Sequence, residues 1–441
     1  MGQQLENDYI GACPPANANR SQPKPCCDPY WQHGSRLTSV IGNDFAKSFK
    51  RDARKRIESA IKTYIVGHLE KIPTCANLMR EILIAEAKMG QLGFFDADKR
   101  LEALSARGDP LEAIDRLVPW ESFRAEIEAV VLTPDELKKS SAGRKPFDAM
   151  LMFRMLVLQA LNNLSDEQVE YQVRDRLSFS RFLGLAIEDG IPDATTLWLF
   201  REKLAKAGLI EKLFDCFDQH LAAKGYMARG GQIIDASIVP VPTQRNSRDE
   251  NAELQAGRTP AGWKQKPAKL RQKDRDARWT KKHGRSFFGY KNHVNADAKH
   301  KLIRHYAVTD AAVHESQELE GLLDTGNTCN DVFADSAYRS AEIEAKLRVS
   351  GYKSRIHRRG RRNHPLSLAQ VRVNHAKSRI RARIEHVFGA QQNAPGGRIV
   401  RTIGMVRARA KIGLQNLAYN IRGLSQRQRK LLEAYFALPH L

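Results

Sequence analysis

The sequence predicts two kinds of domain in succession, an all-helical domain followed by an α/β domain that contains a mixed five-stranded sheet with helices. From Lys145 to Tyr226, apolar residues recur at helical spacing. After Gly230, short runs rich in Ile, Val, Phe and Tyr are separated by turn residues, which is typical of strands. The order there is three strands, then helix, strand, helix, strand and helix, which indicates an α/β domain.

Changes in composition divide the chain into five segments. Residues 1–88 form an N-terminal extension, in which a polar stretch predicted to be disordered precedes a basic helical segment. A short helical lead-in (89–144) leads to the helical domain (145–228), and the α/β domain follows (229–426). A basic insertion at about 245–284, expected to be mobile, interrupts that domain, and 427–441 form a C-terminal tail.

Start signals and periodicity place the individual elements. Helices are expected to begin at Ser165 and Asp193, because both side chains suit the N-cap position. Trp198, beside Leu197 and Phe200, is interpreted as a core residue. The five strands are expected within residues 231–241, 287–295, 301–309, 331–338 and 352–357, and a long last helix is expected from about 366 to 388.

The charge of the chain indicates a polyanionic partner. Its net charge is +22, and between Gly351 and Lys430 about twenty Lys and Arg residues surround one acid, Glu385. Nucleic acid is favoured over a membrane surface, because the sequence has no apolar run of 18 residues. It also lacks a secretory signal pattern, so we expect a cytoplasmic protein.

Three acids occupy informative places in the α/β domain. Asp235 interrupts an apolar strand, although Asp is disfavoured in strands. Asp335 ends the strand run VFAD, where ligand sites collect in α/β sheets. Glu385 lies on the flank of the apolar stripe of the last helix, formed by Ile380, Ile384, Val387 and Phe388. From this flank, Glu385 can point along the sheet edge toward the two aspartates.

Converging carboxylates suit a pair of hard divalent cations, and Mg²⁺ fits oxygen ligands well. The competing interpretation of Glu385 is an ordinary surface ion pair with Arg381, four residues earlier in the helix. Asp297 and Asp310, in a hairpin turn and in a connection, are interpreted as structural.

A family resemblance covers most of the chain. The stretches that carry it are QLGFFDADKRLEALSARGDPLEAI, KPFDAMLMFRMLVLQALNNLSDEQVEYQVRDRLSFSRFLGL, IPDATTLWLFREKL, IIDASIV, FFGYKNHVNAD, VFADSAY, ARIEHVFG and GLQNLAYNIRGL. From Met89 onward the sequence resembles the DDE transposases of bacterial insertion sequences, in the group named with IS and the numeral five. Residues 1–88 lie outside this resemblance; an accessory DNA-binding arm is one explanation for them, and translation begun upstream of the natural start is the favoured one.

The resemblance implies a ribonuclease-H-like catalytic domain whose catalytic and metal-binding acids are Asp235, Asp335 and Glu385. They are separated by 100 and 50 residues, which fits this family. It further implies two Mg²⁺ ions, with Mn²⁺ as a substitute, and cleavage and joining of DNA at transposon ends. The partners are then double-stranded DNA, as terminal inverted repeats and target, and further copies of the chain in a synaptic complex at the bacterial nucleoid.

Basic residues are predicted to contact DNA phosphates. The candidates are Arg379, Arg381 and Arg383 near Glu385, with Arg398, Arg401 and Arg407 further along, and Arg201, Lys203 and Lys206 on the helix that begins at Asp193. Related families have a tyrosine seven residues before the glutamate, an arginine four before it and a lysine seven after it; these positions are Ser378, Arg381 and Gln392 here, so only the arginine matches.

Two classes of function remain open from the sequence. One is an enzyme that cuts and joins DNA, which the presence of all three acids favours. The other is a catalytically inactive or domesticated relative that only binds DNA. An RNA-binding protein has less support, because no aromatic-rich RNA-binding strand is evident.

Overall fold

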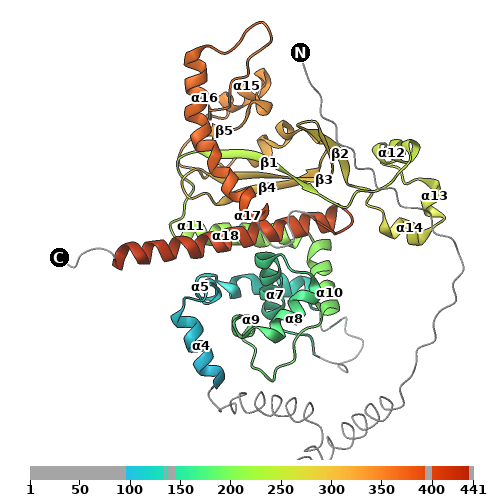
Figure 1. Cartoon of the computed structure of the whole chain (residues 1–441), viewed down its shortest axis with the longest axis vertical. Coiled ribbons are helices and arrows are strands. Elements are labelled where there is room, and N and C mark those ends of the chain that lie inside the picture. The colour runs from blue at the N-terminus through green and yellow to red at the C-terminus, as the bar shows by residue number, and fades with distance from the viewer. Residues whose placement is uncertain (1–95, 134–135, 137–144, 393–399, 437–441) are drawn as a thin grey trace, which may run out of the picture. The chain divides into compact units, whose positions relative to one another are not determined.

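A computed structural model describes residues 96–133, 136, 145–392 and 400–436 (Figure 1). The chain divides into two units, and the described residues belong to the second, which begins at Phe95. The predicted N-terminal extension, Met89 and Arg398 lie outside the described residues. Among the described helices, none is both long and apolar enough to cross a bilayer.

The first part of this unit is helical, as the sequence predicts. Ser165 and Asp193 cap their helices, accepting hydrogen bonds from the Gln168 and Thr196 amides at 3.2 and 2.7 Å, so both predicted starts are confirmed. The helices are α4 (Asp96–Ala106), α5 (Pro110–Leu117), α6 (Arg124–Val131), α7 (Ala149–Asn162), α8 (Asp166–Asp175), α9 (Leu177–Leu183), α10 (Ala194–Lys206) and α11 (Leu209–Ala223).

A mixed sheet of six strands follows, instead of the predicted five. Its strands are β1 (Gln232–Pro240), β2 (Arg278–Lys282), β3 (Arg285–Asp297), β4 (Ile303–Asp310), β5 (Asp331–Phe333) and β6 (Lys353–Ser354). β1 pairs with β3 in antiparallel and with β5 in parallel orientation, and β5 pairs with β6 in parallel orientation. β4 pairs antiparallel with β3. The additional strand, β2, pairs with the first residues of β3.

The extra strand comes from the insertion that was expected to be mobile. Besides β2, this segment contains three helices, α12 (Arg248–Gln255), α13 (Ala261–Lys264) and α14 (Pro267–Gln272). Trp263 is fully buried there, and its indole Nε1 donates to Glu250 at 2.5 Å. A buried tryptophan with a satisfied N–H gives the insertion a small core, which periodicity alone did not indicate.

The predicted last helix is interrupted just before Glu385. It consists of α16 (Leu368–Arg381), a 3-10 turn η6 (Ala382–Ile384) and α17 (Glu385–Gln392), and α15 (Ala341–Val349) precedes it. The predicted apolar stripe is confirmed, since Ile384, Val387 and Phe388 are buried and Ile380 packs against the same core.

The longest element was not predicted. Helix α18 (Met405–Phe436) has 32 residues and includes much of the segment that was interpreted as a C-terminal tail. It contacts α7, α10 and α11 as well as β4, and runs between the helical region and the sheet (Figure 1). Gly413 permits this close packing, because a Cβ there would lie 2.8 Å from Ile210 on α11 and would also meet the Tyr306 hydroxyl on β4.

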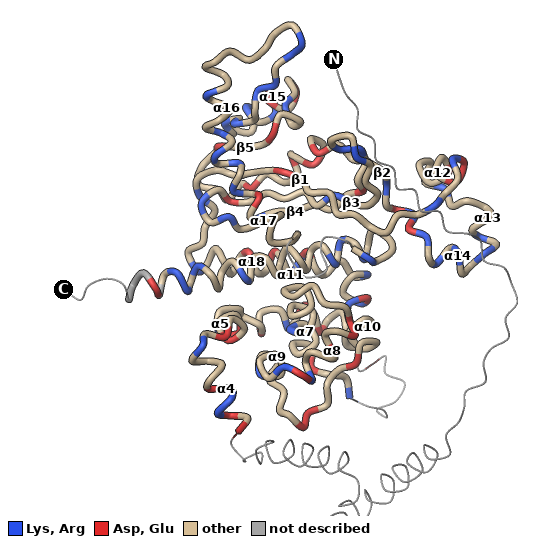
Figure 2. The backbone as a smooth tube through the Cα atoms, in the orientation of Figure 1, with Lys and Arg blue, Asp and Glu red and all other residues tan. Residues whose placement is uncertain are grey.

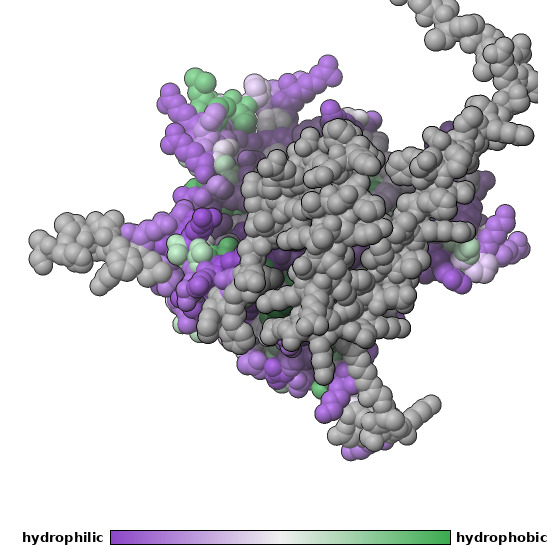
Figure 3. Space-filling model, turned by 60° about the horizontal axis from the view of Figure 1, so that its bottom comes forward, coloured by the Kyte–Doolittle hydropathy of each residue, from purple (hydrophilic) through white to green (hydrophobic). Residues whose placement is uncertain are grey.

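The apolar core divides at the sheet. Ile233 belongs to a cluster that includes α7, α11, α17 and α18, whereas its neighbour Ile234 belongs to a second cluster with Ala334 and Tyr338. Successive residues of a strand point to opposite faces, so Asp235 returns to the face covered by α17 and α18. Hydrophilic side chains dominate the described surface seen in Figure 3.

Candidate active site

Asp235 lies in the middle of β1 with a side chain that is only 15% exposed. Its Oδ1 accepts a hydrogen bond from the Ala236 amide at 2.8 Å, and its Oδ2 accepts one from Arg381 Nη1 at 2.9 Å. A strand that is apolar on both sides of this position holds the carboxylate in place. The sequence did not predict the contact with Arg381, which had been expected beside Glu385.

The surroundings of Asp235 oppose its negative charge. Burial raises its pKa to about 6, and the charges of Asp335 and Glu315 act in the same direction, against the opposing effect of Arg381. A carboxyl group with such a pKa is protonated more readily than usual and has a marked preference for a cation beside it.

The register of the sheet places Asp335 beside Asp235. Ile233 of β1 pairs with Phe333 of β5 in parallel register, so each aspartate follows its paired residue by two positions. Neighbouring strands are about 5 Å apart, and residues separated by two positions share a face. After β5 ends, Asp335 caps the short turn η5 (Ser336–Tyr338) and accepts from the Ala337 amide at 2.7 Å. The strand expected within residues 331–338 therefore ends at Phe333, and its second half forms this turn.

Glu385 approaches Asp235 from the covering helix. It is exposed, begins α17 and lines one cleft together with Asp235, Phe287 and Gln392, with a volume of about 920 Å³. Among the ion pairs of the described residues, none involves Glu385, and Arg381 pairs with Asp235 instead. The interpretation of Glu385 as a surface partner of Arg381 is therefore wrong.

Two further residues at this site were missed by the sequence analysis. Glu315 follows β4 and opens the turn η3 (Glu315–Glu318), and its charge acts on Asp235 and on Tyr338. The Tyr338 hydroxyl is buried and has no hydrogen-bond partner within the described part of the chain, and the same holds for Arg381 Nε. The only sequence signal for Tyr338 was its position in the strand-end stretch ADSAY.

The chemistry of these groups fits a hard divalent cation. Carboxylate oxygens are the ligands that Mg²⁺ and Mn²⁺ prefer, and an unpartnered buried hydroxyl leaves room for a further polar partner. In the described ranges, however, no three acidic, histidine or cysteine side chains are gathered closely enough to hold a metal ion. Arg381 takes one oxygen of Asp235 in this arrangement.

Two family models match parts of this chain. Residues 227–421, which contain all three acids, match the family model "Transposase DDE domain", and residues 98–203 match the model "Transposase domain (DUF772)". These matches support a DDE-type transposase. The boundary between the matched regions agrees with the division into helical and α/β parts.

One solved structure aligns with much of this chain. It is the cryo-EM structure of a piggyBac transposase synaptic complex with hairpin DNA, at 11% sequence identity. The match covers 76% of this chain and 83% of the other, with a TM-score of 0.35, a value too low to establish a shared fold.

A basic groove begins on the other side of Glu385. A second hollow of about 570 Å³ lies there, which shares Glu385 and Gly389 with the first. Half of its other lining residues are cations, namely Lys299, Lys301, Arg422, Arg427 and Lys430. Burial lowers the pKa of Lys301, and the charges of Arg383, Arg427 and Lys430 lower it further. Figure 2 shows Lys and Arg distributed along α18, which supplies three of these residues.

The other predicted DNA-contacting residues differ in their surroundings. Arg379 is exposed and Arg383 donates to the Ala298 carbonyl at 2.6 Å. On α10, Lys203 donates to the Val131 carbonyl at 2.9 Å, and Arg201 is held by Asp166 at 2.6 and 2.8 Å. Arg201 and Lys203 therefore have internal partners that the sequence did not indicate.

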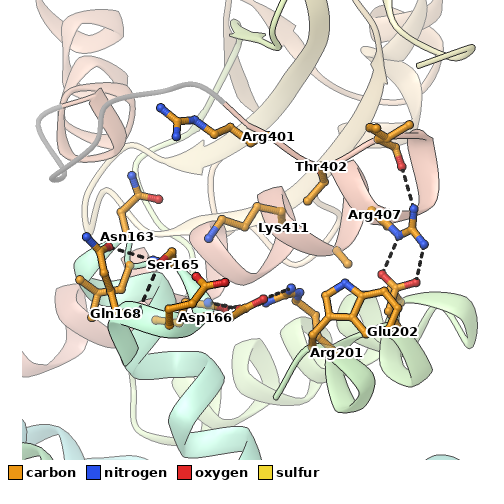
Figure 4. A pocket seen from close by; sticks show the side chains of 17 residues that line it. Asn163, Ser165, Asp166, Gln168, Arg201, Glu202, Arg401, Thr402, Arg407 and Lys411 are labelled. Atoms are coloured by element: carbon orange, nitrogen blue, oxygen red, sulfur yellow. Dashed lines mark hydrogen bonds and ion pairs between the residues drawn. The ribbon is translucent and has the colours of Figure 1, made fainter. Parts of the chain in front are cut away.

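A third hollow, of about 700 Å³, lies between α8, α10 and α18 (Figure 4). Arg407 of α18 donates two hydrogen bonds to Glu202 of α10, at 2.6 and 2.9 Å. Lys411 extends into the hollow from α18, and burial together with the charge of Arg201 lowers its pKa to about 8 (Figure 4). Trp198 lines this hollow and is 39% exposed, so its assignment to the core is wrong, whereas Leu197 and Phe200 are buried.

Proposed function

We propose that the protein is a DNA transposase of the insertion-sequence group to which its sequence is similar, and that Asp235, Asp335 and Glu385 are its catalytic acids. The observation that carries the proposal is the register of β1 and β5, which sets Asp235 and Asp335 two positions beyond a paired residue. Glu385 shares the cleft of Asp235 and completes the set.

The sheet supports a ribonuclease-H-like catalytic domain. Strands β4, β3, β1, β5 and β6 lie side by side, with the antiparallel strands on one side of β1 and the parallel strands on the other. Asp235 lies on the central strand of this set, and helices cover the face to which its side chain returns. The proposed domain boundaries are those of the sequence analysis, with α18 extending the last one.

The carboxylates of Asp235, Asp335 and Glu385 would hold two Mg²⁺ or Mn²⁺ ions. When bound, such ions activate the attacking oxygen and stabilise the leaving oxygen of a phosphodiester in an in-line displacement. Arg381 orients Asp235 through the bond at 2.9 Å, and the exposed part of its guanidinium can donate to a phosphate oxygen.

Duplex DNA is the proposed partner, both as the terminal inverted repeats and as the target. The basic groove beside Glu385 offers phosphate contacts close to the acids, and Arg379 and Arg383 lie on the helix that leads to it. Arg201 and Lys203 remain proposed contacts of the helical region; Lys203 is exposed on α10, and Arg201 would have to exchange its bonds to Asp166 for a phosphate. Assembly of several copies at paired ends and action at the bacterial nucleoid belong to the same proposal.

An inactive relative that only binds DNA is the second candidate. The observation that favours it is the ion pair of Arg381 with Asp235, which occupies a carboxylate oxygen that a cation would need.

One experiment separates the two candidates. The full chain is incubated with a duplex that carries the element's end, with Mg²⁺ or Mn²⁺, and strand cleavage and end binding are measured together. We expect cleavage by the wild type and none by E385Q, with end binding nearly unchanged, because the amide keeps the shape and loses the charge. The matched control is E320Q, which replaces an exposed acid on the turn η4 (Glu320–Leu322) and should leave cleavage normal. Binding without cleavage by the wild type would favour the inactive relative.

A further inference from the structure

Glu315 is an acid that no part of the proposed mechanism uses. It begins η3, directly after the connection that follows β4, and its side chain is only 12% exposed. Acids are rarely so far withdrawn from water unless they are paired or bind a cation. Its surroundings therefore require an explanation.

The partners of Glu315 satisfy it only in part. Its Oε1 lies 3.7 Å from Lys282 Nζ and 3.9 Å from Lys291 Nζ, beyond hydrogen-bond distance. Lys291 directs its Nζ to the Val313 carbonyl instead, at 2.7 Å. Within the described residues, no hydrogen bond to the Glu315 carboxylate is found, so its oxygens can still accept hydrogen bonds or bind a cation.

Glu315 belongs to the same site as the two aspartates. Its turn, η3, packs against η5, which Asp335 caps. Lys282, its nearer partner, lines the cleft of Asp235 and Glu385. The charge of Glu315 raises the pKa of Asp235, after burial and the charge of Asp335.

A second observation indicates that a ligand is expected among these acids. The Tyr338 side chain is fully buried, and its hydroxyl has no partner among the described residues. Tyr338 lies in η5, the turn that Asp335 caps and that packs against the turn of Glu315. A buried hydroxyl without a partner is destabilising, and a bound ion with its water shell would give it one.

We propose that Glu315 is a fourth acidic residue of the active site and helps to bind the divalent cation beside Asp235 and Asp335. Arg381 bonds one oxygen of Asp235 and Lys282 lies 3.7 Å from Glu315, so the neighbouring cations balance these carboxylates only in part, and a divalent ion would balance the remaining negative charge. The inference rests on the proposed function for the identity of the ion, but its test does not depend on cleavage of DNA.

The test measures Mn²⁺ binding to the full chain without DNA, by titration calorimetry and by the loss of the free-ion electron spin resonance signal. We expect E315Q to bind Mn²⁺ at least tenfold more weakly than the wild type, in the range seen for residues that support metal sites. E320Q should bind as the wild type does, because Glu320 is exposed and pairs with Lys346. D235N identifies the site, since the same binding event should be lost in it.

E315D keeps the negative charge and so distinguishes the loss of a metal ligand from a folding defect. E315D should give an affinity between those of the wild type and E315Q, with an unchanged circular dichroism spectrum. Wild-type affinity in a folded E315Q would overturn the inference, and so would affinities of E315D and E315Q that are equal. If the wild type failed to cleave DNA while E315Q still weakened Mn²⁺ binding, the proposed function would fail and the inference would stand.

Discussion

Arg381 Nη1 donates to Asp235 Oδ2 across 2.9 Å, and so joins the end of α16 to the central strand of the sheet. The two residues are 146 positions apart in the chain. The helix is interrupted directly after this contact: the 3-10 turn at Ala382–Ile384 separates Arg381, which bonds to the strand, from Glu385, which lines the cleft.

Removal of this arginine should move the pH dependence of the protein. Arg381 opposes the rise in the pKa of Asp235, so R381A should raise that pKa above its value of about 6. Metal binding needs the ionised carboxylate, so the pH at which Mn²⁺ binding is half-maximal should increase. Titrations between about pH 5 and 8 measure this midpoint, and R379A is the control because Arg379 is exposed. An unshifted midpoint in R381A would contradict the electrostatic role.

Neutralising Asp235 should stabilise the protein at neutral pH. In the unfolded chain its pKa is about 3.9, and in the folded chain it is about 6, so the folded state retains this proton over that interval. The stability that this proton contributes is present below about pH 4 and is lost as pH rises through about 6. D235N should therefore be more stable than the wild type at pH 7, by on the order of 2–3 kcal/mol.

The difference between the two proteins is the quantity to measure, because other groups also titrate in this range. Urea unfolding of the wild type and D235N should show a gap that widens from pH 4 to pH 7. A gap that stays constant with pH would mean that the pKa of Asp235 is not raised.

The basic groove should show itself in the salt dependence of DNA binding. K299A combined with K430A removes two exposed cations from the groove without removing buried contacts. Each lost phosphate contact should lower the slope of log K against log salt by about 0.9, so the slope should fall by nearly 2. The control is K212A with K224A, two exposed lysines of the helical region. Equal slopes for both double variants would exclude the groove as a DNA contact.

The packing of α18 should not tolerate a side chain at Gly413. A Cβ would lie 2.8 Å from Ile210, so G413A should lower the free energy of unfolding by about 1–3 kcal/mol, as overpacking does. G389A is the matched control, because no atom lies within 4 Å of a Cβ at that helical glycine. Alanine there should be neutral or stabilising. Thermal unfolding of both variants tests the difference, and similar melting temperatures would contradict this packing.

Local patterns predicted the elements that carry the acids. The N-caps at Ser165 and Asp193, the apolar run around Asp235 and the stripe of α17 all depend on neighbours in sequence, and all are present. The three acids were proposed from the same local signals and the family resemblance, and the sheet register supports two of them as neighbours.

Contacts between distant segments were beyond such patterns. The i, i+4 rule assigns Arg381 to Glu385, whereas burial of Asp235 attracts the guanidinium across the fold. Glu315 has no local mark that distinguishes it from a turn residue, because its partners come from β2 and β3. Trp198 differs from its buried neighbours only through the hollow beside α18.

Two basic residues of helix α18 are separated by a distance close to one turn of duplex DNA. From Arg407, which holds α10, to Lys430, which lines the groove beside Glu385, the helix advances by about 35 Å at about 1.5 Å per residue. One turn of B-form DNA has nearly the same length, about 34–36 Å. A duplex in contact with both the hollow beside Arg407 and the groove beside Lys430 would therefore present the same groove to each, one helical repeat apart.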